Sequence, residues 1–507
     1  MLAVFYSLEK LLGFVRQVLI ARQFQLSAEL DAFNAANNIP DLLFVLISAG
    51  ALGIAFIPVL SDALEKEGRP ALWKLFSRIA NLIFPVTALF SLVVALFADQ
   101  IVRSQVGIAP GFTSAQQALV ADLMRLNLVA TLLFSLAGMI TAGLQANQHF
   151  FLPALAPIMY DLGMLFGVLI LSPEQGYSFG PLTLPAFGLG IHGLVYGTIL
   201  GAFLYLAIQV PGLLRFHFRW SPSFGLHDSR VRRVLALMGP RILTVFSIQM
   251  VFIIQDNLAS RLPTGAVSAL VFGWLILQVP ETLIGTAMGT ALLPTLSEQV
   301  ARSEQEAYTA TLNRSIRAIL ALTIPLTVLI ALVLPPVVQI LGFESAGTDL
   351  VVQTARLFLL GLLGHTLLEI AVRSFYARQD ALTPLAAAFG MVVLLALLAV
   401  PLSRLLGAPG IALANTLAFS AQAFVLIYIL NRQLGRFLQL GRAPLRILAG
   451  AAVGGLACYG VLWLLGGLAF FQGGLVPGLL SSGLAAIVGA LVTLPFIWPE
   501  VRLLLRL

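Results

Sequence analysis

Long apolar runs are the feature that most constrains how this chain can fold. A helix that crosses a bilayer needs roughly 20 mostly apolar residues, and the 507-residue sequence offers fourteen candidates. They lie at about 3–22, 32–60, 77–98, 120–144, 151–172, 187–213, 234–256, 266–296, 317–342, 352–376, 382–406, 409–432, 445–466 and 477–499. Backbone in lipid must satisfy its own hydrogen bonds, so each run is expected to be helical. With 59% hydrophobic residues, the sequence predicts an all-α polytopic membrane protein with 14 transmembrane helices.

The 29 Lys and Arg residues divide unevenly between the two alternating sets of connections. We assign 20 of them to one set and only 5 to the other, namely Arg22, Arg103, Arg261, Arg356 and Arg404. Because basic connections stay in the cytoplasm, both termini are expected there, with the first helix retained rather than cleaved. Topology thus explains the formal charge of +7, and no nucleic-acid motif accompanies it, so no nucleic-acid partner is expected.

Two short motifs recur about 230 residues apart. Gly53-Ile54-Ala55-Phe56-Ile57-Pro58-Val59-Leu60-Ser61 has a counterpart in Gly289-Thr290-Ala291-Leu292-Leu293-Pro294-Thr295-Leu296-Ser297, at an offset of 236 residues. Gln145 to Phe150, with Pro153 after it, has a counterpart in Tyr376 to Asp380, with Pro384 after it. Matches at nearly equal offset, six spans apart, indicate a duplicated six-helix unit whose copies insert the same way round.

The duplication predicts two parallel-repeat six-helix lobes around a central cavity, followed by two additional helices. The expected boundaries are 1–215 for the N-terminal lobe, 216–233 for a basic cytoplasmic linker, 234–432 for the C-terminal lobe and 433–507 for the last two transmembrane helices. The single cysteine, Cys458, excludes a disulfide framework and a thiolate metal cluster.

Several motifs in order along the chain resemble the MurJ/MviN family of lipid II flippases, in the multidrug/oligosaccharidyl-lipid/polysaccharide exporter superfamily. They are Gly13-Phe14-Val15-Arg16, Asp31-Ala32-Phe33, Ala55 to Ser61, Met238-Gly239-Pro240, Leu292 to Ser297, and Phe375-Tyr376-Ala377-Arg378-Gln379-Asp380. The resemblance implies a non-enzymatic transporter of a bacterial inner membrane that moves an undecaprenyl-pyrophosphate-linked peptidoglycan precursor outward by alternating access. Lipid II and the bilayer are then its partners, with cell-wall synthesis proteins as further candidates.

A diphosphate head group needs fixed cations in a wet cavity, where charges in membrane helices are tolerated. The resemblance places cavity cations at Lys10 and Arg16, and an acidic residue at Asp31. For both cations the alternative is snorkelling to the interface, and Arg22 is also a candidate to anchor the outer end of its helix. Asp31 is interpreted as an ion-pair partner of Arg16 or Arg22, as an N-cap, or as both. The substrate-binding set is Lys10, Arg16, Arg22, Asp31, Asn37 and Asn38, although the two amides can equally serve backbone groups freed by Pro40.

A second set of candidates concerns ion coupling. The resemblance implies that Asp256 acts in cation coupling, with Asn415 and Thr416 as further oxygen ligands, and the alternative is a surface end-cap. No metal site and no resident cofactor are expected. Structural roles are assigned to Pro58, Pro294, Arg378 and Asp380, the last two as a clamp or helix start. His365, Glu369 and Arg373 share one helix face, and the simplest interpretation is a Glu369–Arg373 pair at i, i+4.

This sequence also departs from the family pattern. Many members carry two Arg and a Glu where this chain has Phe44, Val45 and Ala49 on one helix, and an Arg and a Glu where it has Leu275 and Gln278 on another. Arg125, Arg241 and Glu281 are candidates to compensate. The alternatives are therefore a flippase for another undecaprenyl-linked oligosaccharide, an organic-cation exporter on the same fold, or a non-transporting scaffold. No nucleophile elbow or phosphate-binding loop indicates an enzyme.

Overall fold

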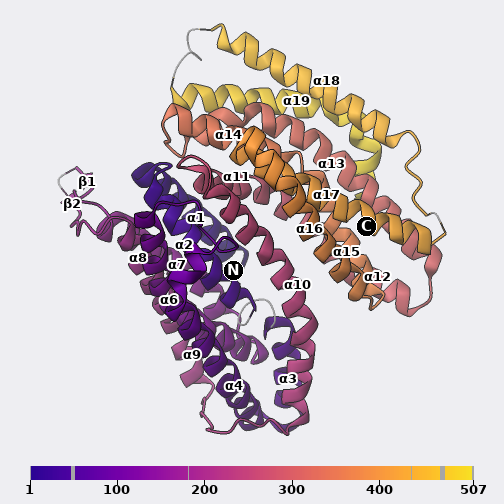
Figure 1. Cartoon of the computed structure of the whole chain (residues 1–507). Coiled ribbons are helices and arrows are strands. Elements are labelled where there is room, and N and C mark those ends of the chain that lie inside the picture. Colours follow the sequence, from indigo (N-terminus) through magenta and orange to yellow (C-terminus); the bar gives the residue numbers. More distant parts are fainter. Residues whose placement is uncertain (1, 47–51, 181, 436, 469–473, 505–507) are drawn as a thin grey trace. The chain divides into compact units, whose positions relative to one another are not determined.

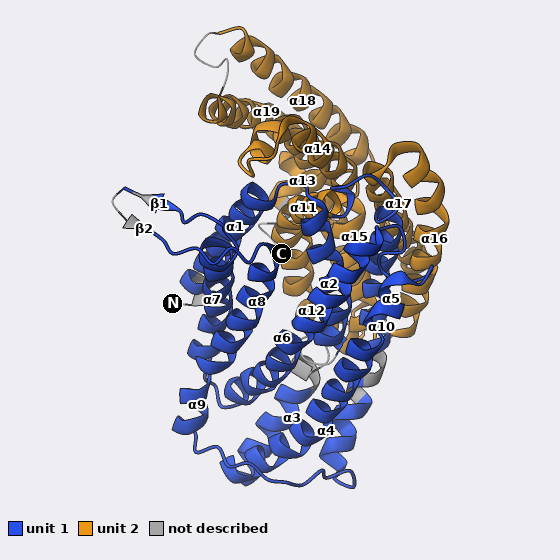
Figure 2. Ribbon diagram, turned by 60° about the vertical axis from the view of Figure 1, so that its left-hand side comes forward, with its two compact units in different colours: residues 1–267 blue, residues 268–507 orange. Residues whose placement is uncertain are grey.

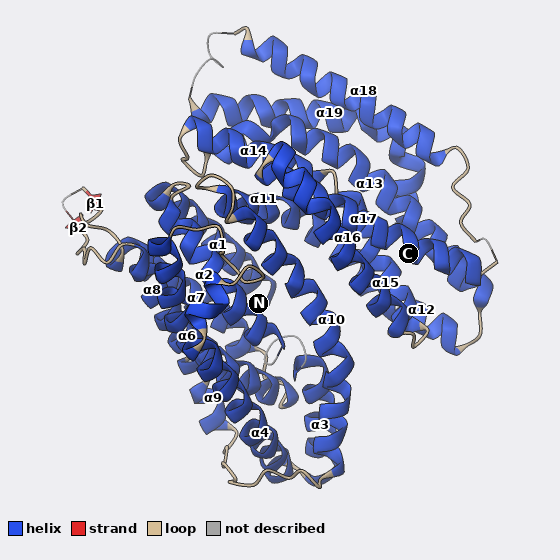
Figure 3. Cartoon of the chain, viewed as in Figure 1, coloured by secondary structure: helices blue, strands red, loops and turns tan. Residues whose placement is uncertain are grey.

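The structure is a computed structural model that describes residues 2–46, 52–180, 182–435, 437–468 and 474–504. Helices account for almost all of its regular structure (Figure 3). The exception in the described part is a short antiparallel hairpin of β1 (Ser178–Phe179) and β2 (Leu182–Thr183). An all-helical fold is what the apolar runs predict, because helices satisfy their backbone groups internally.

The chain divides into two compact units, Met1–Val267 and Ser268–Leu507 (Figure 2). The first contains α1 (Leu2–Phe24), α2 (Ala28–Phe44), α3 (Leu52–Glu67), α4 (Arg69–Leu96), α5 (Ala98–Arg103), α6 (Ser114–Ala146), α7 (Phe151–Phe166) with the π-helical turn Gly167–Leu171, α8 (Ile191–Ala207), α9 (Val210–Arg215) and α10 (Ser229–Ala259) (Figure 1). The second contains α11 (Ala266–Glu281), the π-helical turn Thr282–Thr286, α12 (Ala287–Ala301), α13 (Gln305–Gln339), α14 (Ser345–Leu359), α15 (Leu362–Ala377), α16 (Leu382–Leu406), α17 (Ala408–Gln433), α18 (Ala443–Gly466) and α19 (Leu475–Leu504). The first two residues of α11 precede the boundary between the two units.

In the first unit, α6 is the helix against which most others pack. It contacts α2, α3, α4, α5 and α8, and a reciprocal capping box between Thr113 and Gln116 fixes its start. A second centre is aromatic: Trp73 and Phe76 stack edge to face with Phe218, and the Trp73 indole donates to the Phe216 carbonyl at 2.9 Å. These contacts hold the linker after α9 against α4.

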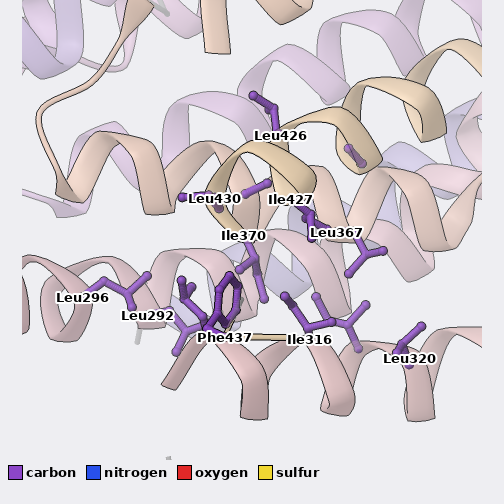
Figure 4. Packing of buried hydrophobic residues seen from close by; sticks show 14 of the residues in the cluster. Leu292, Leu296, Ile316, Leu320, Leu367, Ile370, Leu426, Ile427, Leu430 and Phe437 are labelled. Carbon is purple, nitrogen blue, oxygen red and sulfur yellow. The ribbon is translucent and has the colours of Figure 1, made fainter. Parts of the chain in front are cut away.

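In the second unit, the core lies where α12, α13, α15 and α17 meet. Figure 4 shows the buried cluster, with Leu292 and Leu296 from α12, Ile316 and Leu320 from α13, Leu367 and Ile370 from α15, and Leu426, Ile427 and Leu430 from α17. Beside it, α13, α18 and α19 pack on one another. Small residues allow that approach: a Cβ on Gly450 would lie 2.5 Å from the Cβ of Phe496.

Among the described residues, ten helices are long and apolar enough to cross a membrane, or eleven if α14 and α15 form one span bent by 41°. The expected spans at 3–22 and 234–256 are helical, as α1 and α10, but fall outside the ten. In α1 the reason is charge, since it carries Glu9, Lys10, Arg16 and Arg22. The expected span at 32–60 is described as α2 and α3, and residues 47–51 between them, including Ala49, lie outside the described residues.

The two turns of the second repeated motif have the same backbone geometry. Gln148 and Gln379 both adopt positive φ, at 59° and 60°. The next amide closes each helix onto a carbonyl five residues back, His149 N to Leu144 O at 2.9 Å and Asp380 N to Phe375 O at 3.0 Å. Both are Schellman endings built on glutamine instead of the usual glycine.

The first repeated motif also has matching burial. Pro58 lies exposed inside α3 between the buried Phe56 and Leu60, and Pro294 lies exposed inside α12 between the buried Leu292 and Leu296. In both copies the proline therefore lies away from the packed face of its helix.

The compact units do not divide the chain where the duplication predicts. The contacts of α10 with α2, α3 and α4 place it in the first unit, whereas the duplication assigns residues 234–432 to the second lobe. The two divisions rest on different criteria, since one follows packing and the other follows ancestry, so the duplicated lobes stay a prediction.

Helices α7 and α8 approach so closely that only glycines fit between them. A Cβ on Gly197 would lie 2.8 Å from the Cα of Gly167 and 3.1 Å from the carbonyl oxygen of Gly163. Both neighbours are backbone atoms, so relief would require moving a helix.

We therefore expect Gly197→Ala to destabilise the protein by about 1–3 kcal/mol, the usual cost of overpacking. Gly390→Ala on α16 is the matched control, because nothing lies within 4 Å of the added Cβ. Thermal unfolding in detergent should give a lower midpoint for Gly197→Ala than for Gly390→Ala. Equal midpoints would contradict the close approach of α7 and α8.

Candidate functional site

Arg16 on α1 lies against α7, where it pairs with a carboxylate inside the bundle. Its Nη1 is 2.5 Å from Asp161 Oδ1, and its guanidinium lies over the Tyr160 ring at 5.3 Å from the centroid. The side chains are 17% and 4% exposed. An unpaired charge at this position would be costly, so the carboxylate and the ring face stabilise the cation.

At least one N–H donor of the Arg16 guanidinium makes no hydrogen bond to the described part of the chain. An arginine carries five N–H donors, and the buried Nε has no hydrogen-bond partner in the part of the chain that the structure describes. Asp161 occupies Nη1. A planar cation with unused donors is suited to phosphate, which accepts such bonds in a bidentate geometry.

Lys10 lies six residues earlier on α1 and is held far more loosely. Its Nζ is 3.4 Å from Glu9 Oε1, and 79% of its side chain is exposed. Arg22 near the end of the same helix is exposed, and its carbonyl accepts a bond from the Gln25 side chain at 3.1 Å. The three cations of α1 therefore differ in environment, and Arg16 is the enclosed one.

The polar residues of α2 connect neighbouring helices. Asn37 accepts a bond from Asn127 of α6 at 2.5 Å, and Asn38 donates to Asp256 of α10. Asp31, 1% exposed, accepts a bond from the backbone N–H of Gly265 at 2.6 Å. The N-cap of α2 is Ser27 rather than Asp31, and Arg16 pairs with Asp161 rather than with Asp31.

The residues assigned to ion coupling each have a protein partner. Asp256 accepts from Asn38 in the first unit. In the second unit, Asn415 is buried and contacts His365 Nε2 at 3.2 Å, and Thr416 donates to the Leu357 carbonyl at 2.6 Å. No group of three His, Cys, Asp or Glu side chains within the described ranges has the proximity to hold a metal ion.

His365, Glu369 and Arg373 share one face of α15 but make separate contacts. His365 is buried against Phe419, with ring centroids 4.3 Å apart, and meets Trp274 edge to face. Glu369 pairs with Arg373, as its i, i+4 spacing predicts, and Arg373 also contacts Thr290 at 3.3 Å.

Arg378 and Asp380 occupy the turn between α15 and α16. Arg378 donates to Gln433 at 2.6 Å. Asp380 accepts from the Leu382 and Thr383 amides at 3.1 and 3.0 Å and from the Thr383 hydroxyl at 2.7 Å. Partial burial would raise the pKa of the Asp380 carboxyl, but these hydrogen bonds and Arg378 outweigh it and hold the pKa below its usual range. The contacts fit the expected helix start.

The candidates to compensate for missing cations lie in varied settings. Arg125 is directed to the junction of α4 and α5, where it pairs with Asp99 of α5 at 2.5 Å and donates to the Ala95 carbonyl of α4. Glu281 precedes the π-helical turn of the second unit and accepts from Thr286 at 3.2 Å. The side chain of Arg241 lies outside the described residues.

Three residues of this site are absent from the sequence-based candidates: Asp161, Tyr160 and Asn127. Each lies in a run that the hydropathy pattern treats as an ordinary span. The available signal was chemical, since a lone carboxylate in an apolar helix requires a partner, and Asp161 is such a residue.

Membrane-spanning helices in two units, with an arginine–carboxylate pair and cross-helix amides inside the first, define a polytopic helical membrane bundle. The lipid II flippase MurJ family model matches residues 20–484, so the chain belongs to that family. The lipid II flippase MurJ of Burkholderia cenocepacia is 29% identical over 422 residues, covering 81% of this chain and 78% of the relative. The probable lipid II flippase MurJ of Rhizobium tropici is 29% identical over 464 residues, covering 89% and 84%.

Solved structures agree at the level of the fold. A lipid II flippase MurJ in an inward closed conformation superposes with a TM-score of 0.77 at 19% identity, covering 99% of both chains. An inward-facing multidrug resistance transporter of the MATE family, in the MOP superfamily, gives 0.69 at 14% identity, covering 85% of this chain and 95% of that one. The fold is thus the one that MurJ and MATE transporters share.

We expect Asp380→Ala to destabilise the protein by about 0.5–2 kcal/mol, the usual cost of losing an N-terminal helix cap. Because the folded-state pKa is lowered, the carboxylate's contribution is complete above about pH 4 and is lost as the pH falls through the folded-state pKa. Unfolding midpoints of wild type and variant should therefore differ by the same amount at pH 7 and pH 5, and should converge below pH 4.

Asp62→Ala is the matched control for this prediction, because Asp62 forms an exposed i, i+4 pair with Lys66 at 2.7 Å. Its removal should cost only about 0.3–0.5 kcal/mol. A loss for Asp380→Ala no larger than for Asp62→Ala would contradict the capping role.

Proposed function

We propose that this chain is a lipid II flippase that carries the undecaprenyl-pyrophosphate-linked peptidoglycan precursor from the inner to the outer leaflet by alternating access. Family membership and the fold support the proposal. The observation that carries it is Arg16, an enclosed cation with unused donors inside a membrane bundle. Such an arrangement suits a diphosphate, because an unpaired buried donor is a cost that a phosphate oxygen would relieve.

The proposed architecture has fourteen transmembrane helices in two parallel six-helix lobes, 1–215 and 234–432, around a central cavity, joined by the linker 216–233 and followed by residues 433–507. Matching Schellman turns at Gln148 and Gln379 support the duplication. The uneven division of Lys and Arg supports a bacterial cytoplasmic membrane location with both termini in the cytoplasm. Cell-wall synthesis proteins are the proposed protein partners.

In the proposed mechanism, Asp161 pairs with Arg16 until the substrate binds. In the empty state the carboxylate neutralises the guanidinium, which avoids the cost of an unpaired charge in a low-dielectric site. An arriving diphosphate accepts bonds from the free Nε and competes with Asp161 for the other donors. When the lobes change state, Asp161 recovers Arg16 and the substrate leaves. This exchange moderates affinity, which a transporter needs because it must release what it binds.

The other residues of α2 and α10 are proposed to hold the first unit in shape during this cycle. Asn37 and Asn38 link α2 to α6 and α10, and Asp31 holds the Gly265 amide. Their bonds leave limited capacity for sugar or peptide contacts. Lys10, exposed and loosely held, is the proposed second phosphate contact, with Arg22 at the helix end. Coupling to a cation through Asp256, Asn415 and Thr416 stays a proposal without a formed ligand cluster.

A second candidate function is export of an organic cation, and the favouring observation is the neutralisation of the enclosed charges. Arg16 is paired with Asp161 and Arg373 with Glu369, so net positive charge is low. Replacing Arg16 separates the candidates, since loss of a cation should abolish diphosphate transport but not impair transport of a cationic solute.

We expect Arg16→Ala to lose complementation in a bacterium depleted of its lipid II flippase, because the diphosphate would lose its enclosed cation. The growth of depleted cells that express the variant is the measurement. Arg103→Ala is the matched control: Arg103 is mostly exposed and lies 3.7 Å from Asp99 in an i, i+4 pair, so it should complement normally. Comparable membrane levels of both variants confirm folding, and normal growth with Arg16→Ala would refute the phosphate contact.

A further inference from the structure

The second unit contains a basic pocket, separate from the residues discussed above, at the end where α18 begins. It is lined by Arg317 of α13, by the segment Gln439 to Ala443, and by Leu445 and Arg446 of α18, and its volume is about 710 Å³. Three of the eight lining residues are arginines: Arg317, Arg442 and Arg446. We refer to it as the α18 basic pocket.

One carboxylate pairs with two of these three cations. Glu500 of α19 is completely buried and accepts from Arg317 Nη2 at 2.9 Å and from Arg446 Nη2 at 2.5 Å. Arg442 is exposed and has no ion-pair partner in the part of the chain that the structure describes. The buried Nε atoms of Arg317 and Arg446 also lack hydrogen-bond partners there. The pocket thus has an excess of two positive charges and several unused donors.

The wall of the pocket is fixed in place. Asn313 of α13 exchanges two hydrogen bonds with the backbone of Gln439, at 3.3 and 3.2 Å, and Asn431 accepts from the Leu438 amide at 2.9 Å. The 24-residue helix α18 starts at Ala443 without a side-chain cap. The positive dipole end of this helix therefore adds to the field of the arginines.

The position of the pocket matches the depth of lipid phosphates. Arg317 and Arg446 stand where the apolar stretches of α13 and α18 begin, and Glu500 follows the apolar stretch of α19. Leu445 lines the pocket and is 72% exposed, and Leu448 on the next turn is 52% exposed. Trp498, two residues before Glu500 on α19, is exposed, as is typical at a membrane interface. The cationic pocket is therefore continuous with an apolar face for acyl chains.

We propose that the α18 basic pocket binds the headgroup phosphate of an anionic phospholipid, with the acyl chains along the exposed face of α18. The arginines supply charge-assisted donors to the phosphate, and Leu445 and Leu448 supply the apolar contact that a free ion would not use. Basic pockets between membrane helices are a known form of lipid recognition. The pocket shares no residue with the candidate substrate-binding set, so its test is a binding measurement.

The experiment uses the purified full-length protein and dioleoylphosphatidylglycerol as the probe, titrated in detergent and followed by native mass spectrometry. Dioleoylphosphatidylcholine and inorganic phosphate are the comparison ligands. Arg442→Gln removes the unpartnered cation, and Arg432→Gln, an exposed arginine near the end of α17 outside the pocket lining, is the matched control. Equal unfolding midpoints without lipid establish that both variants fold.

Wild type should bind phosphatidylglycerol more tightly than phosphatidylcholine, and Arg442→Gln should weaken that binding about tenfold, as expected for one charge-assisted hydrogen bond. Arg432→Gln should leave it unchanged. Equal losses in the two variants, or none in either, would overturn the proposal, as would phosphatidylcholine binding as tightly. Displacement of phosphatidylglycerol by millimolar inorganic phosphate would assign the pocket to a free ion and overturn the lipid assignment.

Discussion

The cost of a charge in a low-dielectric bundle is the constraint on which this structure depends. Arg16 is stabilised by Asp161 and the Tyr160 ring, and the fully buried Glu500 is stabilised by two arginines. Breaking such a pair typically costs about 3–5 kcal/mol, because the remaining partner stays buried and unpaired. The pairs connect α1 to α7 and α19 to α13 and α18, so each also fixes a helix contact.

Close helix approach is the second requirement, and small residues provide it. Gly197 meets Gly167 at backbone distance, and Gly450 gives Phe496 room. In lipid, the association of helices depends on packing rather than on the hydrophobic effect. Glycines at helix contacts allow that packing, and the chain has 44 glycines in all.

Much of the fold was predictable from the sequence, and the site much less so. Apolar runs gave the all-helical membrane class, and the repeated motifs pointed to turns whose backbone matches at Gln148 and Gln379. Hydropathy could not predict that α14 and α15 are separate helices, or that α10 packs with the first unit. Both features depend on tertiary packing. Arg16 was identified as a candidate, but its partner Asp161 lies 145 residues away, and a single sequence contains no signal for that distance.

The most direct test of the account is the affinity of the purified protein for undecaprenyl pyrophosphate in the wild type, Arg16→Gln and Asp161→Asn. If Asp161 competes with the diphosphate for Arg16, the two substitutions must change the affinity in opposite directions. Arg16→Gln should weaken binding by about tenfold or more, since it removes a charge-assisted contact, and Asp161→Asn should tighten it, since it removes the competitor. Changes of the same sign in both variants, or none in either, would contradict the account.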